Sequence, residues 1–135
     1  MQIAGWSRTI PTDTYSTADS PSSHSPCPAF VAGRASFQRA SAKDYPGTDY
    51  DLICFFDCLH DMGDPVGAAR RAHAALKTGG TVLLVEPFAN DELDQNLNPV
   101  GRMFYAASTC ICTPNSLSQD VGLGLGAQAG EKRLR

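Results

Sequence analysis

The chain has 135 residues and a mass of 14.4 kDa, which allows one domain with a core of moderate size. The formal net charge of −3 and the pI near 5.4 give no basic footprint, so we expect no nucleic-acid partner. No run approaches the roughly 20 apolar residues that span a bilayer, and the N-terminus lacks a secretion signal, so we expect no membrane association.

Five cysteines form an odd set in a chain without an export signal, which favours reduced thiols and a cytoplasmic location. The chain has no CxxC pair, and His24 has no cysteine or histidine at ligand spacing, so the sequence predicts no metal site. We expect the thiols to be structural, with Cys54 acting as a small apolar residue inside a strand.

Residues 1–28 differ in composition from the rest of the chain. They are rich in Ser, Thr, Pro and Asp and show no hydrophobic periodicity. We interpret them as an irregular or disordered leader and place the domain at residues 29–135. Within the domain, residues 36–40 are a short, polar candidate strand, and Pro46 and Gly47 mark a turn in the loop that follows.

The stretch from Tyr50 to Phe88 is the most informative part of the sequence, and it predicts strand, helix and strand. The apolar runs at 52–56 and 81–85 lack period-2 alternation, as expected for parallel strands that are covered on both faces. Asp64 is placed to cap the helix between them, and Pro65 to occupy its first turn. Two strands joined through a helix in this way are expected to be parallel neighbours.

One face of that helix is expected to be buried, and a glycine pair is expected to end the helix. Apolar or weakly polar residues recur there at three- and four-residue steps, which is typical of a face that packs on a sheet. The residues of this face are Val66, Ala69, His73 and Leu76. Gly79 and Gly80 then supply the permissive backbone on which helices commonly end.

Polar residues gather where the two predicted strands end. Asp57, His60, Asp61 and Asp64 follow the first strand, and Glu86 follows the second. In open parallel sheets, ligands bind beyond the carboxyl ends of the strands. We therefore expect the functional site at this edge of the sheet.

An acidic surface loop at 89–96 is expected to precede a second helix, which Asn98 caps and Pro99 opens. That helix carries an apolar stripe, which predicts core packing or the lining of a pocket. Its members are Val100, Met103, Phe104, Ala107 and Ile111. We expect Thr113 and Pro114 to break this helix. Ser116 with Gln119 is a capping-box pattern for another short helix.

The run VGLGLGAQAG has alternating glycines, as in some phosphate-binding loops. Such a loop requires a buried strand that delivers the glycines and a helix that receives the phosphates, and neither is predicted here. We therefore interpret this run as a flexible turn, or as small residues that let helices approach closely.

Together, these segments resemble class I S-adenosylmethionine-dependent methyltransferases of a small-molecule bacterial type, over about residues 29–135. Residues 36–42 look like the family's adenine-binding strand, with Ser41 where the family usually carries Asp. Residues 51–61 resemble its fourth strand, which ends in LHD, and residues 75–87 resemble its ALKTGG turn and fifth strand. The resemblance implies an α/β fold with a doubly wound, Rossmann-like parallel sheet and S-adenosylmethionine as cofactor.

The resemblance also implies roles for individual residues. His60 would take the proton from a hydroxyl of a small-molecule substrate, and Glu86 would orient its imidazole, in keeping with general-base chemistry. In the alternative reading, the histidine hydrogen-bonds the loop or packs on the cofactor without transferring a proton. The residues implied to contact the cofactor are Ser41, Ala42, Phe56, Asp57 and Asp61. In the alternative, Asp61 only starts the loop, and Asp57 caps neighbouring N–H groups.

The sequence departs from the family pattern at both ends. The family's glycine-rich loop and the acidic residue that holds the ribose have no counterpart before Ser36, and its last two strands are not found. We therefore expect a partial sheet that lacks the first strands and the glycine-rich loop. Two hypotheses follow: a methyltransferase that acts on an unidentified small molecule, or a catalytically inactive, truncated remnant of one. The acceptor atom and the oligomeric state stay open.

Overall fold

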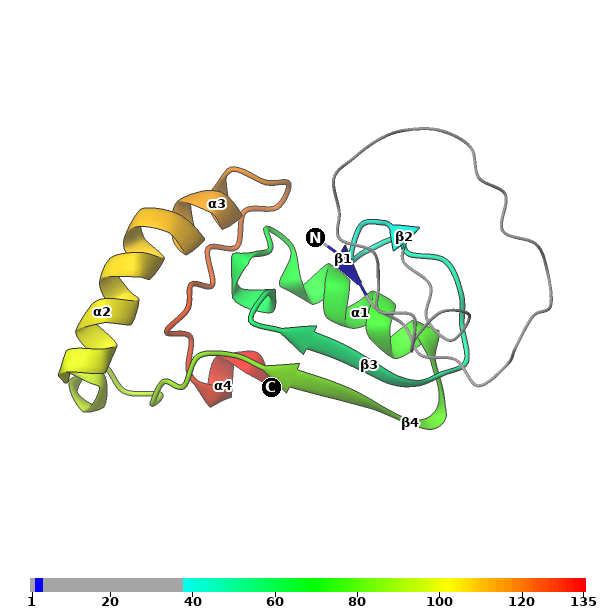
Figure 1. The fold of residues 1–135 in the computed structure, drawn as a ribbon, viewed down its shortest axis with the longest axis horizontal. Helices are drawn as coiled ribbons and strands as arrows, with labels where there is room; N and C mark the ends of the chain where they lie inside the picture. The colour runs from blue at the N-terminus through cyan, green and yellow to red at the C-terminus, as the bar shows by residue number, and fades with distance from the viewer. Residues whose placement is uncertain (1, 4–37) are drawn as a thin grey trace, which may run out of the picture.

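The computed structural model describes residues 2–3 and 38–135 (Figure 1). Strand β1 (Gln2–Ile3) pairs with β2 (Gln38–Arg39) in a short antiparallel sheet. The candidate strand at 36–40 is thus confirmed over two residues, but in the described part of the chain it pairs with β1 and not with the parallel sheet. The rest of the predicted leader, with Cys27, lies outside the described residues. The prediction that the first strands are missing also concerns that part of the chain.

Strands β3 (Tyr50–Phe56) and β4 (Leu76–Val85) form the parallel pair that the sequence predicts. Leu52 lies opposite Thr81, and Phe56 lies opposite Val85. At the start of the pair the register shifts, because Tyr50 lies opposite Leu76 and residues 77–80 bulge out of β4. The carboxyl ends of the two strands therefore meet at one edge of the sheet.

Helix α1 (Pro65–Ala75) begins as predicted. The Asp64 carboxylate accepts a hydrogen bond from the Gly67 N–H at 2.8 Å, and Pro65 is the first helical residue. This hydrogen bond, more than the nearby Lys43 ammonium, lowers the pKa of the Asp64 carboxyl. The cap fixes the direction in which the chain leaves the loop that contains His60.

The end of α1 and its buried face differ from the prediction. The helix ends at Ala75, and the glycine pair lies within β4, where Gly79 has a φ of 79° and serves the bulge. The predicted face, which included Val66, Ala69 and His73, is exposed. The residues buried instead are Pro65, Ala68, Ala72 and Ala75. Three small alanines on this face let the helix backbone lie close to the sheet.

Only one face of the parallel pair is covered in the described part of the chain, where α1 packs against Ile53 and Phe55 (Figure 1). The expectation that both faces are covered is therefore wrong for these residues. The large apolar side chains that are exposed on the strands are Leu52, Phe56, Val82, Leu83 and Val85. The core consists of Tyr45, Ile53, Phe55, Leu59, Met62, Ala68, Ala72 and Ala75.

Helix α2 (Pro99–Ala107) has the predicted cap, since the Asn98 side chain accepts a hydrogen bond from the Gly101 N–H at 2.9 Å. The expected break at Thr113 and Pro114 is wrong. A π-helical turn, Ser108–Cys112, joins α2 to α3 (Thr113–Leu117). The Thr113 N–H donates to the Ser108 carbonyl five residues back, and this wider turn accommodates the proline ring that follows.

The apolar stripe of α2 is largely exposed, with Met103 at 60% and Ile111 at 65%, so it does not form the expected core. The acidic loop is a surface loop as predicted, apart from the buried Asn96 within a 3₁₀ turn, Asp94–Asn96. Residues 86–135 contain no strand, and the short α4 (Glu131–Leu134) lies near the end of β4 (Figure 1). Among the described helices, none is long and apolar enough to span a bilayer.

Candidate functional site

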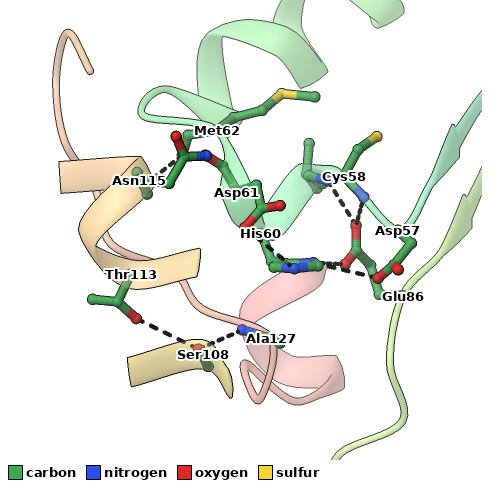
Figure 2. A network of polar contacts seen from close by, with 12 residues as sticks. Asp57, Cys58, His60, Asp61, Met62, Glu86, Ser108, Thr113, Asn115 and Ala127 are labelled. Carbon is green, nitrogen blue, oxygen red and sulfur yellow. Dashed lines mark hydrogen bonds and ion pairs between the residues drawn. The ribbon is translucent and has the colours of Figure 1, made fainter. Parts of the chain in front are cut away.

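The site lies beyond the carboxyl ends of β3 and β4 (Figure 2). His60 belongs to a 3₁₀ turn, Leu59–Asp61, that follows β3, and Glu86 follows β4 directly. The chain leaves β3 through Asp57, whose φ of 51° lies in the left-handed region that aspartate tolerates better than most residues. This sharp exit turns His60 back toward the end of β4.

His60 and Glu86 form the centre of the site. His60 Nδ1 and Glu86 Oε2 make a short hydrogen bond, and each side chain is 5% exposed. The other carboxylate oxygen, Oε1, accepts hydrogen bonds from the Leu59 N–H at 2.8 Å and the Cys58 N–H at 3.2 Å. Since the carboxylate accepts at Nδ1, that nitrogen carries the proton and Nε2 keeps its lone pair. The pair thus fixes both the orientation and the tautomer of the imidazole.

Two further carboxylates lie near the ring. Asp57 Oδ1 is 3.9 Å from His60 Nδ1, and Asp61 Oδ1 is 3.5 Å from Nε2. The Asp57 side chain is 74% exposed, so solvent screens its charge. Asp61 Oδ1 is buried and accepts no hydrogen bond from the described residues. With Glu86, these groups place three carboxylates around one imidazole ring.

Cys112 joins this site, although its position in the sequence predicts only a structural thiol. It is the last residue of the π-helical turn, and its sulfur lies near His60 and the Asp61 carboxylate. Burial, followed by the polar contact with the Asp61 side chain and by the negative charge of that carboxylate, raises the pKa of the Cys112 thiol to about 11. Burial also raises the pKa of the Cys58 thiol. Both remain protonated at neutral pH, so neither thiol is an activated nucleophile.

Side chains of α3 and the residues after it hold the turn that contains His60. Ser116 is fully buried, and its hydroxyl donates to the Met62 carbonyl at 2.6 Å and accepts from the Gly124 N–H at 3.1 Å. Gln119 donates to the Asp61 carbonyl at 2.8 Å and accepts from the Gly63 N–H at 3.0 Å. The predicted capping box is therefore wrong, because Ser116 and Gln119 make these longer-range contacts instead.

The glycine-rich run that follows contains neither helix nor strand, and it packs against the same loop. Gly122, Gly124 and Gly126 have φ values between 62° and 74°, which glycine adopts without strain. The Gly126 N–H donates to the His60 carbonyl at 3.4 Å, and the Leu123 N–H donates to the Gly63 carbonyl at 2.9 Å. No local spacing predicts these contacts, because more than 50 residues separate the partners.

The predicted cofactor residues lie in two places. Asp57 and Asp61 are beside His60, whereas Ser41 and Ala42 line a cavity of about 290 Å³. The other residues lining this cavity are Ala40, Lys43, Met62, Asp64, Gln119 and Asp120. Its volume is at the lower end of the range for ligand pockets, about 300 Å³. Phe56 is 62% exposed and is not part of the cavity lining.

The lining of this cavity is partly apolar and partly polar. Alanine and methionine side chains provide apolar walls, and the carboxylates of Asp64 and Asp120 can accept hydrogen bonds from an amino group. The Ser41 hydroxyl accepts a hydrogen bond from the Lys43 N–H at 3.2 Å. Met62, two residues after His60, connects this cavity to the turn that carries the imidazole.

Comparison with known proteins identifies the family of the chain. Residues 4–120 match a family model described as a methyltransferase domain. The chain therefore belongs to the class I S-adenosylmethionine-dependent methyltransferase family, whose fold is of the Rossmann-like α/β type. No curated protein matches the chain. The family match begins within the segment that the sequence analysis set aside as a leader, and the boundary between residues 28 and 29 stays a prediction.

Proposed function

We propose that this chain binds S-adenosylmethionine and methylates a hydroxyl group of a small molecule, with His60 as general base and Glu86 as its positioning residue. The observation that carries the proposal is the buried His60–Glu86 pair at the carboxyl ends of two parallel strands. Family membership supports methyl transfer in general. We also propose a cytoplasmic location, which the free thiols of the four described cysteines support.

The residues of the pair divide the proton chemistry between them. When bound, S-adenosylmethionine supplies an electrophilic methyl group. His60 Nε2 takes the proton of the acceptor hydroxyl as that oxygen becomes nucleophilic. Glu86 holds the opposite side of the ring and stabilises the imidazolium that results. Because the imidazole is already oriented, little of its freedom is lost when the substrate binds.

The cavity beside Ser41 and Ala42 is the proposed adenine site. Its apolar walls and the carboxylate of Asp64 support this assignment. Asp57, at the exposed end of β3, and Asp61, beside the imidazole, are proposed to face the rest of the cofactor. We retain Phe56 as a proposed contact because its ring is exposed at the end of β3, next to Asp57.

The proposal is tested by incubating the purified chain with methyl-labelled S-adenosylmethionine and a panel of phenols, catechols and hydroxy acids. His60→Ala should lower labelling of the accepted substrate by about 10²- to 10⁴-fold, the usual contribution of a general base. His73→Ala is the matched control, since His73 is exposed on α1 and should leave the rate unchanged. Equal rates for His60→Ala and the wild type would refute the role of His60 as base.

The inactive alternative predicts a different result. A wild-type chain that is folded by circular dichroism, yet neither binds S-adenosylmethionine nor labels any member of the panel, would favour a catalytically inactive protein. Binding without labelling would support the cofactor assignment alone, with the acceptor outside the panel.

A further inference from the structure

His60 and two neighbouring side chains form a group of three potential metal ligands. A ring nitrogen of His60, a carboxylate oxygen of Asp61 and the sulfur of Cys112 all lie within 4.8 Å of one another, and Nε2 is the nitrogen that faces Asp61 Oδ1. The imidazole is 5% exposed and the Asp61 side chain is 38% exposed, but the Oδ1 atom of Asp61 is itself buried and has no hydrogen-bond partner among the described residues. A buried carboxylate oxygen that faces a ring nitrogen and a thiol is better satisfied by a cation held among the three groups.

The distances suit a tetrahedral ion. With bonds of about 2.0–2.3 Å, ligand atoms around zinc lie about 3.4–3.7 Å apart. His60 Nε2 and Asp61 Oδ1 are already 3.5 Å apart. The Cys112 sulfur lies within 4.8 Å of a ring nitrogen of His60 and a carboxylate oxygen of Asp61, so a shift of about 1 Å would complete the three-ligand arrangement.

The contacts around the ligands also resemble those of a metal site. Glu86 accepts a hydrogen bond at Nδ1, which is how carboxylates hold histidines that bind metals through Nε2. A second group, Asp57, His60 and Glu86, lies on the Nδ1 side. It is the weaker candidate, because an ion there would have to displace the hydrogen bond between Nδ1 and Glu86.

The two segments that supply the ligands are tied together. The Asp61 carbonyl accepts hydrogen bonds from Gln119 at 2.8 Å and from Asn115 at 3.3 Å. Ser116 joins Met62 to α3, which begins directly after Cys112. The π-helical turn that ends at Cys112 places one extra residue in that turn, and such turns often occur at functional sites. The ligand positions are therefore fixed by the fold and not by a loose loop.

We propose that His60 Nε2, Asp61 and Cys112 form a site for a divalent cation of the zinc class, with one coordination position open. The nitrogen, oxygen and sulfur set matches zinc and cobalt better than magnesium or calcium, which prefer oxygen ligands alone. The inference goes beyond the proposed methyl transfer. An ion on Nε2 occupies the lone pair that a general base requires, so bound zinc would inhibit His60-dependent turnover.

The test uses Co²⁺ as a spectroscopic probe with the reduced, chelator-treated chain and no methyl donor. The wild type should bind one Co²⁺ and develop the charge-transfer absorption of a thiolate ligand, and Zn²⁺ should remove it by displacement. Cys112→Ser should abolish this absorption. Cys110→Ser is the matched control, because Cys110 is exposed two residues away and should keep it. Glu86→Gln should weaken binding about 10- to 100-fold.

Two results would overturn the metal site. One is a folded wild type that gives no saturable Co²⁺ absorption, and the other is a Cys112→Ser variant that keeps the absorption unchanged. If Cys112→Ser does not fold, Asp61→Asn serves instead and should weaken Co²⁺ binding at least 10-fold; unchanged affinity would contradict the proposal. Because no methyl donor is present, failure here leaves the proposed methyl transfer untouched.

Discussion

Glu86 binds the imidazole of His60 with one carboxylate oxygen and two backbone N–H groups of the same turn with the other. A single side chain at the end of β4 therefore determines both the conformation of the turn after β3 and the tautomer of its histidine.

The first prediction concerns that tautomer. Long-range ¹H–¹⁵N correlation spectra in mildly alkaline buffer should show His60 with its proton on Nδ1 and a bare Nε2, because Glu86 accepts at Nδ1. The exposed His73 should show mixed tautomers. A proton on Nε2 of His60 would mean that Glu86 does not orient the ring as described.

Replacement of Glu86 separates its structural role from its chemical role. Glu86→Ala leaves the N–H groups of Cys58 and Leu59 without their acceptor, and we expect a loss of about 1–3 kcal/mol in the free energy of unfolding. Glu86→Gln keeps a carbonyl oxygen as acceptor and should lose less stability, yet still slow methyl transfer. Urea unfolding of both variants checks the order, and equal stabilities would contradict it.

Much of the region around Glu86 could be predicted from local signals. The apolar runs predicted the parallel pair, and Asp64 with Pro65 predicted the start of α1. The polar residues after each strand predicted that His60 and Glu86 belong to the site. These features depend on the chemistry of a few consecutive residues. They can therefore be predicted from short stretches of the sequence.

Other features depend on partners distant in the chain. The buried face of α1 could not be predicted, because alanines at Ala68 and Ala72 are as compatible with an exposed helix as with a buried one. Cys112 reaches Asp61 only because α2 continues through a π-helical turn instead of ending before Pro114. Ser116 carries a capping signal, but a carbonyl 54 residues away takes its hydrogen bond.

Like Glu86, Ser116 holds the turn that contains His60 in place through hydrogen bonds. Ser116→Ala should lower the free energy of unfolding by about 1–3 kcal/mol, because the Met62 carbonyl and the Gly124 N–H both lose a partner in a buried position. Ser118→Ala is the control, since Ser118 is exposed and bonds only locally, to the Asn115 carbonyl. Thermal unfolding of the two variants should differ clearly, and equal stabilities would contradict the anchoring role.

The environment of Cys112 predicts its reactivity. With its pKa raised to about 11, the thiol in chelator-treated protein should react with iodoacetamide far more slowly at pH 9 than the exposed Cys110 does. Peptide mapping by mass spectrometry distinguishes the two sites. Faster labelling of Cys112 than of Cys110 would contradict the burial described here.

The raised pKa of the Cys112 thiol makes the stability of the fold depend on pH. Below pH 9.0, the ordinary thiol value, the folded and unfolded states both hold the proton of Cys112. As the pH rises from 9.0 toward about 11, the unfolded chain loses the proton first, so the folded state becomes less stable. The wild type should lose more stability over this interval than Cys112→Ser, as measured by denaturant unfolding. Parallel losses would contradict the assignment.

Calorimetric titration of the purified chain with S-adenosylmethionine tests the central claim most directly, because it requires no knowledge of the acceptor. We predict saturable binding of one equivalent with micromolar affinity, weakened when Ala42→Trp fills the cavity beside Met62 and unchanged by His73→Ala. A chain that is folded by circular dichroism and gives no heat of binding would contradict the proposal that this protein is an S-adenosylmethionine-dependent methyltransferase in function as well as in family.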